Sequence, residues 1–231
     1  MHHGFNWLNI LPGFNTLSIP VAGTVFVFAL IVIFTIVFRV SLKKNKNHIV
    51  PTEKCTLHNI FEIAYEGIMN LLKTVIGEKE GPHFFPLIGG TFVFIFLSNL
   101  LGVIPGFTPP TDALTTNAAC AVVIFIATHY YGIKAHKGGY IKHFTGPFWW
   151  LAVIFVPIEI ISHLARPFSL TLRLYGNMLG DHTVLGIFSE LVPLVVPIVF
   201  LALGVFVSFI QAFIFSMLSM LYIGNAIAHE H

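Results

Sequence analysis

One stretch of the sequence decides how this chain folds. It reads Glu159-Ile-Ile-Ser-His-Leu-Ala-Arg-Pro-Phe-Ser-Leu-Thr-Leu-Arg-Leu-Tyr-Gly-Asn-Met178, and it places the guanidinium of Arg173 in the middle of an apolar helix. Arginine stays protonated at any pH that a protein meets, so it cannot reduce the cost of burial by losing its charge. A permanent charge at membrane depth therefore indicates a functional site, and its partner has to be found.

The composition of the chain indicates a membrane protein. Its 231 residues are 56% hydrophobic and 10% charged, whereas a soluble domain carries roughly a quarter charged residues. At about 20 residues per span, this length predicts a single all-α membrane domain of about five or six helices over residues 1–231. The net charge of +2 is too small to indicate a nucleic-acid partner.

Apolar runs predict where the chain crosses the membrane. We expect a first span over residues 19–40, a second over 84–104 and a third over 117–133. The first run lacks the basic start and the cleavage pattern of a signal peptide, so we expect it to be retained. The last two apolar segments, 148–189 and 192–228, are too long for upright spans. Strong tilt, or a course near the membrane plane, would accommodate them.

The segments between the spans predict the orientation. Residues 57–76 carry apolar side chains at helical spacing, which predicts an amphipathic helix on the membrane surface. Lysines gather in segments 41–82 and 134–146, whereas segment 105–116 has neither Lys nor Arg. Basic loops face the cytoplasm, so we expect the N-terminus outside and the C-terminus in the cytoplasm.

A stripe of polar and small residues follows each of the last two segments. On the first, residues recur every three or four positions, which places them on one helix face: Glu159, Ser162, Arg166, Ser169, Arg173, Asn177 and Gly180 or Asp181. The second carries Gly204, Ser208, Gln211, Ser219 and Tyr222. Two such helices can enclose a hydrated path, because lipid cannot satisfy these groups. Close packing and interhelical hydrogen bonds explain the serines and Gly204 equally well.

Arg173 has no carboxylate of its own within reach. A same-helix partner would stand three or four residues away, and those positions hold Ser169, Leu170, Gly176 and Asn177. At 1.5 Å per residue, Asp181 lies about 12 Å along the axis and Glu159 about 21 Å the other way. Residues 192–228 contain no acid. A structural ion pair within the chain is the alternative, but the sequence favours a counter-charge from another subunit.

Titratable side chains stand at both ends of the first stripe. Asp181 and His182 lie at one end, and histidine titrates near neutral pH. Glu159 lies in an apolar run at the other end, which favours an aqueous pocket there. An acid, a fixed cation and an acid–histidine pair in this order indicate a proton path with a barrier in its middle. The sequence has no nucleotide-binding glycine loop, no nucleophile elbow and no helical histidine pair with acidic support, so we expect no catalysis, cofactor or metal.

Several segments closely resemble one family. Residues 169–178 (Ser-Leu-Thr-Leu-Arg-Leu-Tyr-Gly-Asn-Met) and 210–223 resemble the signature of subunit a of F-type ATP synthases, and residues 98–106 and 109–117 resemble its second and third spans. The resemblance covers about residues 84–231. It implies a non-catalytic stator subunit in a bacterial inner membrane. Its partners would be a rotating c-ring, the peripheral stalk subunit b and the remaining ATP synthase subunits.

The resemblance also implies roles for residues around the central cation. Arg173 matches the family's essential arginine, which meets the membrane-embedded carboxylate of each c subunit; that carboxylate would supply the missing partner. Asn177 and Gln211 match polar residues beside this arginine. Glu159 matches the acid of the cytoplasmic half-channel.

The external half-channel departs from the family pattern. His182 stands where many relatives have glutamate, and Gly204 where some have histidine, while this chain has the neighbouring acid Asp181. Asp181 and His182 are therefore the candidates for the external proton relay. Ser169 and Tyr222, one on each stripe, complete the expected ion-translocation residues.

Two other functions use some of the same features. A stand-alone channel or secondary transporter could use Arg173 as an anion site, but the sequence shows none of the internal repeats on which many transporter folds are built. A purely structural membrane scaffold would leave both polar stripes unexplained. The stator reading accounts for both stripes and for the missing counter-charge.

Overall fold

The computed structural model describes residues 7, 17–44, 57–104, 106–136, 152–191 and 196–228. All regular elements in this part of the chain are helices, so the all-α prediction is confirmed. In order they are α1 (Ile19–Lys44), α2 (Leu57–Val75), the short 3-10 turn η2 (Gly81–Phe84), α3 (Phe85–Val103), the turn η3 (Pro110–Asp112), α4 (Leu114–His136), α6 (Ala152–Leu191) and α7 (Val196–Ile227). Five of the helices are long and apolar enough to cross a membrane, which confirms a polytopic membrane protein.

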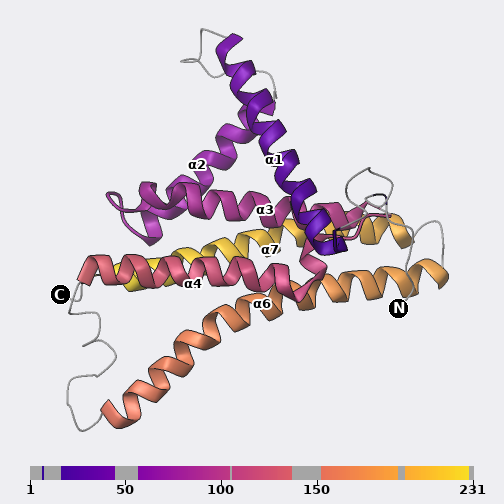
Figure 1. Ribbon diagram of the computed structural model, residues 1–231. Helices are drawn as coiled ribbons and strands as arrows, with labels where there is room; N and C mark the ends of the chain where they lie inside the picture. Colours follow the sequence, from indigo (N-terminus) through magenta and orange to yellow (C-terminus); the bar gives the residue numbers. More distant parts are fainter. Residues whose placement is uncertain are drawn as a thin grey trace.

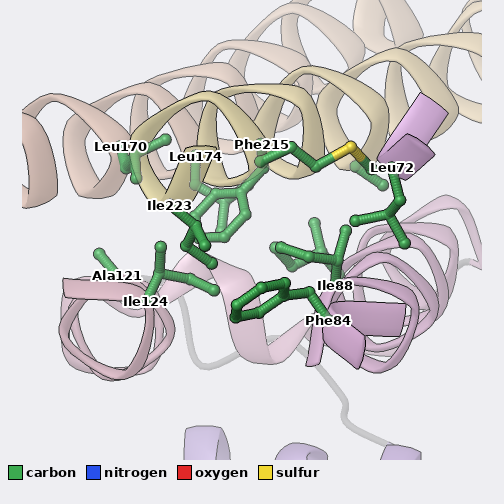
Figure 2. Packing of buried hydrophobic residues seen from close by; sticks show 12 residues of the cluster. Leu72, Phe84, Ile88, Ala121, Ile124, Leu170, Leu174, Phe215 and Ile223 are labelled. Atoms are coloured by element: carbon green, nitrogen blue, oxygen red, sulfur yellow. The ribbon is translucent and has the colours of Figure 1, made fainter. Parts of the chain in front are cut away.

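Four helices form the packed part of the molecule. α3 lies along α7, and α4 packs against both α6 and α7, whereas α1 and α2 lie to one side (Figure 1). The core is apolar and draws on α2, η2, α3, α4, α6 and α7, as Figure 2 shows for Leu72, Phe84, Ile88, Ala121, Ile124, Leu170, Leu174, Phe215 and Ile223. Lipid is as apolar as these side chains, so close van der Waals packing rather than the hydrophobic effect holds such helices together.

α1 touches the other helices mainly near its start. Ala22 and Val27 are buried, and a Cβ at Gly23 would lie 3.1 Å from the ring of Pro110 in η3. Farther along, the apolar side chains of α1 are exposed, for example those of Ile33 and Val37. Figure 1 shows the helix leaving the packed group in this region. Lipid or another protein must cover this face.

α6 and α7 are longer than upright spans. At 1.5 Å per residue, the 40 residues of α6 and the 32 of α7 extend about 60 Å and 48 Å, against about 30 Å of hydrocarbon. α6 contains Pro157 and Pro167, and Figure 1 shows it bending so that its first half diverges from α4. Proline interrupts the helical hydrogen bonds and permits such a bend. The expected segments began at 148 and 192, and residues 148–151 and 192–195 lie outside the described part.

A tight corner joins α2 to α3. Gly77 has a φ of 118°, which favours glycine, and its carbonyl accepts a hydrogen bond from the Gly81 amide at 2.9 Å. Gly81 lies against the end of α2, because a Cβ there would be 2.6 Å from the carbonyl oxygen of Leu72. The corner holds α2 against the packed helices, where Leu72 is fully buried.

Gly81→Ala should destabilise the protein. The added methyl group would collide with the backbone of α2 rather than with a movable side chain, and such overpacking costs about 1–3 kcal/mol. The measurement is thermal unfolding of the purified protein in detergent. Gly67→Ala is the control, because nothing lies within 4 Å of a Cβ there and alanine is favoured in a helix by about 0.5–1 kcal/mol. Equal unfolding temperatures for Gly81→Ala and the unchanged protein would contradict the tight corner.

Candidate functional site

Arg173 lies on the outer side of α6. The side of the helix that packs against the rest of the chain carries His163, Leu170, Leu174 and Met178, all buried. Arg173 is exposed, and within the described part of the chain it has no hydrogen-bond, salt-bridge or ring partner. The structure thus presents an unpaired cation on a face that the chain itself leaves uncovered.

The two polar stripes differ in where they face. On α6, Ser162, Ser169, Asn177 and Gly180 are exposed like Arg173, and Glu159, Arg166 and Asp181 are half-buried. On α7, by contrast, Ser208, Gln211 and Ser219 are buried. The spacing alone suggested that the two stripes could enclose a path between them. In the structure they do not simply face each other. The stripe of α6 runs along the edge of its packed face, because apolar residues such as Leu170 and Leu174 take the interface.

A hydrogen bond joins the two helices close to Arg173. The Asn177 side-chain amide donates to Oε1 of Gln211 at 2.6 Å. The serines of α7 behave differently, since Ser208 donates to the carbonyl oxygen of Gly204 at 2.7 Å and Ser219 to that of Phe215 at 2.8 Å. Both serine hydroxyl groups therefore donate within their own helix, and not to another helix as the packing alternative included.

A small cavity of about 10 Å³ lies between α4, α6 and α7, on the Glu159 side of Arg173. The residues that line it include Thr128, His129, His163, Arg166 and Tyr222. The Cζ atom of Arg166 is 5.2 Å from the centre of the Tyr222 ring, within the range of a cation–π interaction. We call this space the inner cavity.

Glu159 is linked to the inner cavity through a neighbour on its own helix. Its Oε1 atom lies 3.2 Å from Nε2 of His163, one helical turn later. The two side chains are 30% and 10% exposed, respectively. The carboxylate thus lies at the edge of the packed helices, whereas its histidine partner lines the inner cavity.

A second cavity, which we call the outer cavity, lies between α3, α6 and α7 on the other side of Arg173. Its volume of about 30 Å³ is enough for at least one water molecule. Asn99, Asp181 and Ser208 supply its polar lining. Gly204 also lines it and leaves space there, since a Cβ at Gly204 would meet only Val103, at 3.4 Å.

A hydrogen-bonded network fixes Asn99 of the outer cavity. The Thr111 hydroxyl donates to Oδ1 of Asn99 at 2.7 Å, and the Asn117 amide donates to the Thr111 carbonyl oxygen at 2.8 Å. All three residues are buried. The network ties η3 and the start of α4 to α3, so one wall of the cavity is held rigidly.

Packed apolar side chains separate the two cavities. Along α6 the inner cavity reaches Leu170 and the outer cavity begins at Met178. Between them Leu174, Ala212 and Phe215 are at most 1% exposed. Arg173 stands at the level of this apolar layer, on the outer surface of α6.

The structure assembles the expected site residues into separate groups. Asn177 meets Gln211, Tyr222 belongs to the inner cavity and Asp181 to the outer one. Ser169 is exposed on α6, one turn before Arg173. His182 follows Asp181 on the helix, but its side chain lies outside the part that the structure describes.

Sequence reasoning overlooked His163 and His129. The spacing of four residues between Glu159 and His163 was a usable signal, because such positions are neighbours on a helix. His129 of α4 gave no such signal. Its place beside His163 depends on how α4 packs against α6.

The fold and these cavities define a polytopic membrane protein with polar groups buried among its spans. Over residues 23–224 the chain matches the family model described as ATP synthase A chain. It is 53% identical over 175 residues to ATP synthase subunit a of Geobacter sp. (strain M21), and 51% identical over 175 residues to that of Trichlorobacter lovleyi, in each case over 76% of both chains. It is 43% identical to the Bdellovibrio bacteriovorus subunit over 235 residues, 98% of this chain and 99% of the relative. The chain belongs to the ATP synthase subunit a family.

The Asn177–Gln211 hydrogen bond should couple α6 and α7 energetically. In a double-mutant cycle of Asn177→Ala and Gln211→Ala, we expect an interaction free energy of about 0.6 kcal/mol and at most about 1.7 kcal/mol, the range measured for such bonds in membranes. The measurement is the free energy of unfolding in detergent. Asn177→Ala combined with Ser219→Ala is the control and should be additive, because Ser219 bonds only to its own helix. Additivity in both cycles would show that the bond is not formed.

Proposed function

We propose that this chain is the non-catalytic stator subunit of an F-type ATP synthase membrane sector. It would provide two offset half-channels through which protons pass to and from a rotating c-ring. The observation that carries the proposal is the exposed Arg173, unpaired among the described residues and level with the apolar layer between the two cavities. A stand-alone transporter would enclose such an anion site, whereas this one is open to a partner.

Protons from outside would enter through the outer cavity. Asp181 lines it together with Asn99 and Ser208, so a carboxylate is available to bind a proton next to water. From there the proton would pass to a carboxylate of the ring. The neutral carboxyl group could then rotate into lipid, because burying it costs far less than burying its charged form.

Arg173 would act on the ring carboxylate that returns from lipid. An opposite charge nearby stabilises the ionised form, so the carboxyl group releases its proton at this point. The proton would leave past Glu159 and through the inner cavity to the cytoplasm. Leu174 and Phe215, packed between the cavities, would oppose a direct leak, which dissipates about 2.3 kcal/mol per charge and 100 mV.

The surface around Arg173 suits a large apolar partner. Large apolar side chains are exposed on both α6 and α7, among them Phe168, Leu172, Leu179, Phe206 and Phe213. We assign this surface to the c-ring, and we assign subunit b and the other ATP synthase subunits as further partners from the family. The bacterial relatives support a bacterial inner membrane, and the distribution of lysines supports an external N-terminus and a cytoplasmic C-terminus.

Arg173→Ala should abolish coupled proton transport. Without the fixed cation, the returning ring carboxylate keeps its proton and the barrier between the half-channels is lost. The measurement is ATP synthesis driven by an imposed proton gradient in membrane vesicles that contain the complex. Arg39→Gln is the control, because it removes an exposed guanidinium at the end of α1 and should leave synthesis unchanged. Proton-driven synthesis by the Arg173→Ala complex would refute the proposal.

Asp181→Asn should slow proton transport more than His182→Gln does. Asp181 lines the outer cavity, and losing a positioned proton-transfer group typically costs about 10² to 10⁴-fold. The measurement is the rate of proton-driven ATP synthesis, with Asp181→Glu as the variant that should retain a large part of it. A greater loss in His182→Gln would assign the external relay to the histidine instead.

A further inference from the structure

Two histidines meet at the inner cavity. The ring of His163 on α6 lies 5.1 Å from that of His129 on α4, centre to centre and at 77°. Both line the cavity. His163 is 8% exposed, and its Nε2 atom is 3.2 Å from the Glu159 carboxylate. Three proton-binding groups thus form a row that leads from α4 to the edge of α6.

Hydrogen bonds orient both rings. Nδ1 of His129 lies 3.1 Å from the Phe125 carbonyl oxygen. A carbonyl only accepts, so Nδ1 carries the hydrogen and Nε2 is the atom of the neutral ring that can bind a further proton. Nε2 of His163 faces the carboxylate in the same way, as a donor. Each ring therefore has a defined side for taking up or releasing a proton.

The charged and titratable groups around His163 come from three helices. They are Glu159 and Arg166 of α6, His129 of α4 and Tyr222 of α7. The guanidinium of Arg166 is held over the Tyr222 ring, so its positive charge is a fixed part of the cavity. It opposes the charging of both histidines at once, which favours passage of one proton at a time.

We propose that His163 and His129 are proton carriers of the inner half-channel and act in series with Glu159. This inference rests on the proposed function and adds two residues to it. During ATP-driven pumping, a proton from cytoplasmic water binds Nε2 of neutral His129 and then passes through a water in the inner cavity to Nδ1 of His163. The imidazolium of His163 releases its Nε2 proton to the Glu159 carboxylate. The histidine ring is neutral again, and a carboxylic acid has formed that can deliver the proton toward the ring.

The histidines add an ability that Glu159 alone lacks. In water a glutamate is already ionised near neutral pH and holds protons poorly there, whereas an imidazole binds and releases them. Proton capture from the cytoplasm limits pumping most when protons are scarce. The contribution of the histidines should therefore be greatest at alkaline pH.

The experiment measures ATP-driven proton pumping into inverted membrane vesicles that contain the whole complex, between about pH 6 and about pH 8. His163→Gln keeps a donor for Glu159 but cannot carry a proton. We expect pumping to fall about 10-fold at about pH 8 and less at about pH 6. This lies below the usual 10² to 10⁴-fold effect of a proton-transfer group, because Glu159 and water remain. His129→Gln should shift the pH profile in the same direction.

The control is His83→Gln, which removes an exposed imidazole at η2 that lines neither cavity and should leave the profile unchanged. A loss of equal size at every pH would indicate a structural role and overturn the inference. Unchanged pumping in both His163→Gln and His129→Gln would also overturn the inference. In that case the proposed function still stands if Arg173→Ala abolishes pumping. If His163→Gln does not assemble with the ring, His129→Gln, on another helix, decides the matter alone.

Discussion

A permanent cation in a membrane helix must meet either water or an opposite charge, and the rest of the structure follows from this constraint at Arg173. The chain offers it no carboxylate, and α6 turns it outward rather than into the packed helices. Burying it among Leu170 and Leu174 would have cost several kcal/mol without a partner. The exposed position keeps the charge available to a group outside the chain, as the proposed stator role requires.

The remaining polar groups are arranged around this cation at two depths. Asp181 and Asn99 belong to the outer cavity, whereas His163 and Tyr222 belong to the inner one. Tight packing between the cavities keeps them apart, and the Asn177–Gln211 bond fixes α6 to α7 at that level. The contacts that hold the helices together thus also separate the two cavities. The prolines of α6 contribute by letting its first half bend away from α4.

Much of this could be predicted from local sequence. Apolar runs longer than a bilayer needs predicted the helices, and helical spacing predicted the amphipathic α2. Asn177 and Gln211 were expected beside Arg173, and the structure joins them to each other. His163 could have been found from its distance of four residues to Glu159. His129 could not, because residues 34 positions apart in the chain meet only through the packing of α4 against α6.

The sequence by itself determined that the chain is an all-α membrane protein with an arginine that has no acid in reach. These properties depend on composition and on spacing along one helix, which local geometry sets. Only the tertiary structure decided that the stripe of α6 lies at the edge of its packed face while that of α7 is largely buried, and that two separate cavities flank the cation. These properties depend on which helix faces pack together, and several apolar faces of similar size could form the same interface. Packing selected Leu174 and Phe215 for the interior, and Arg173 was left on the surface.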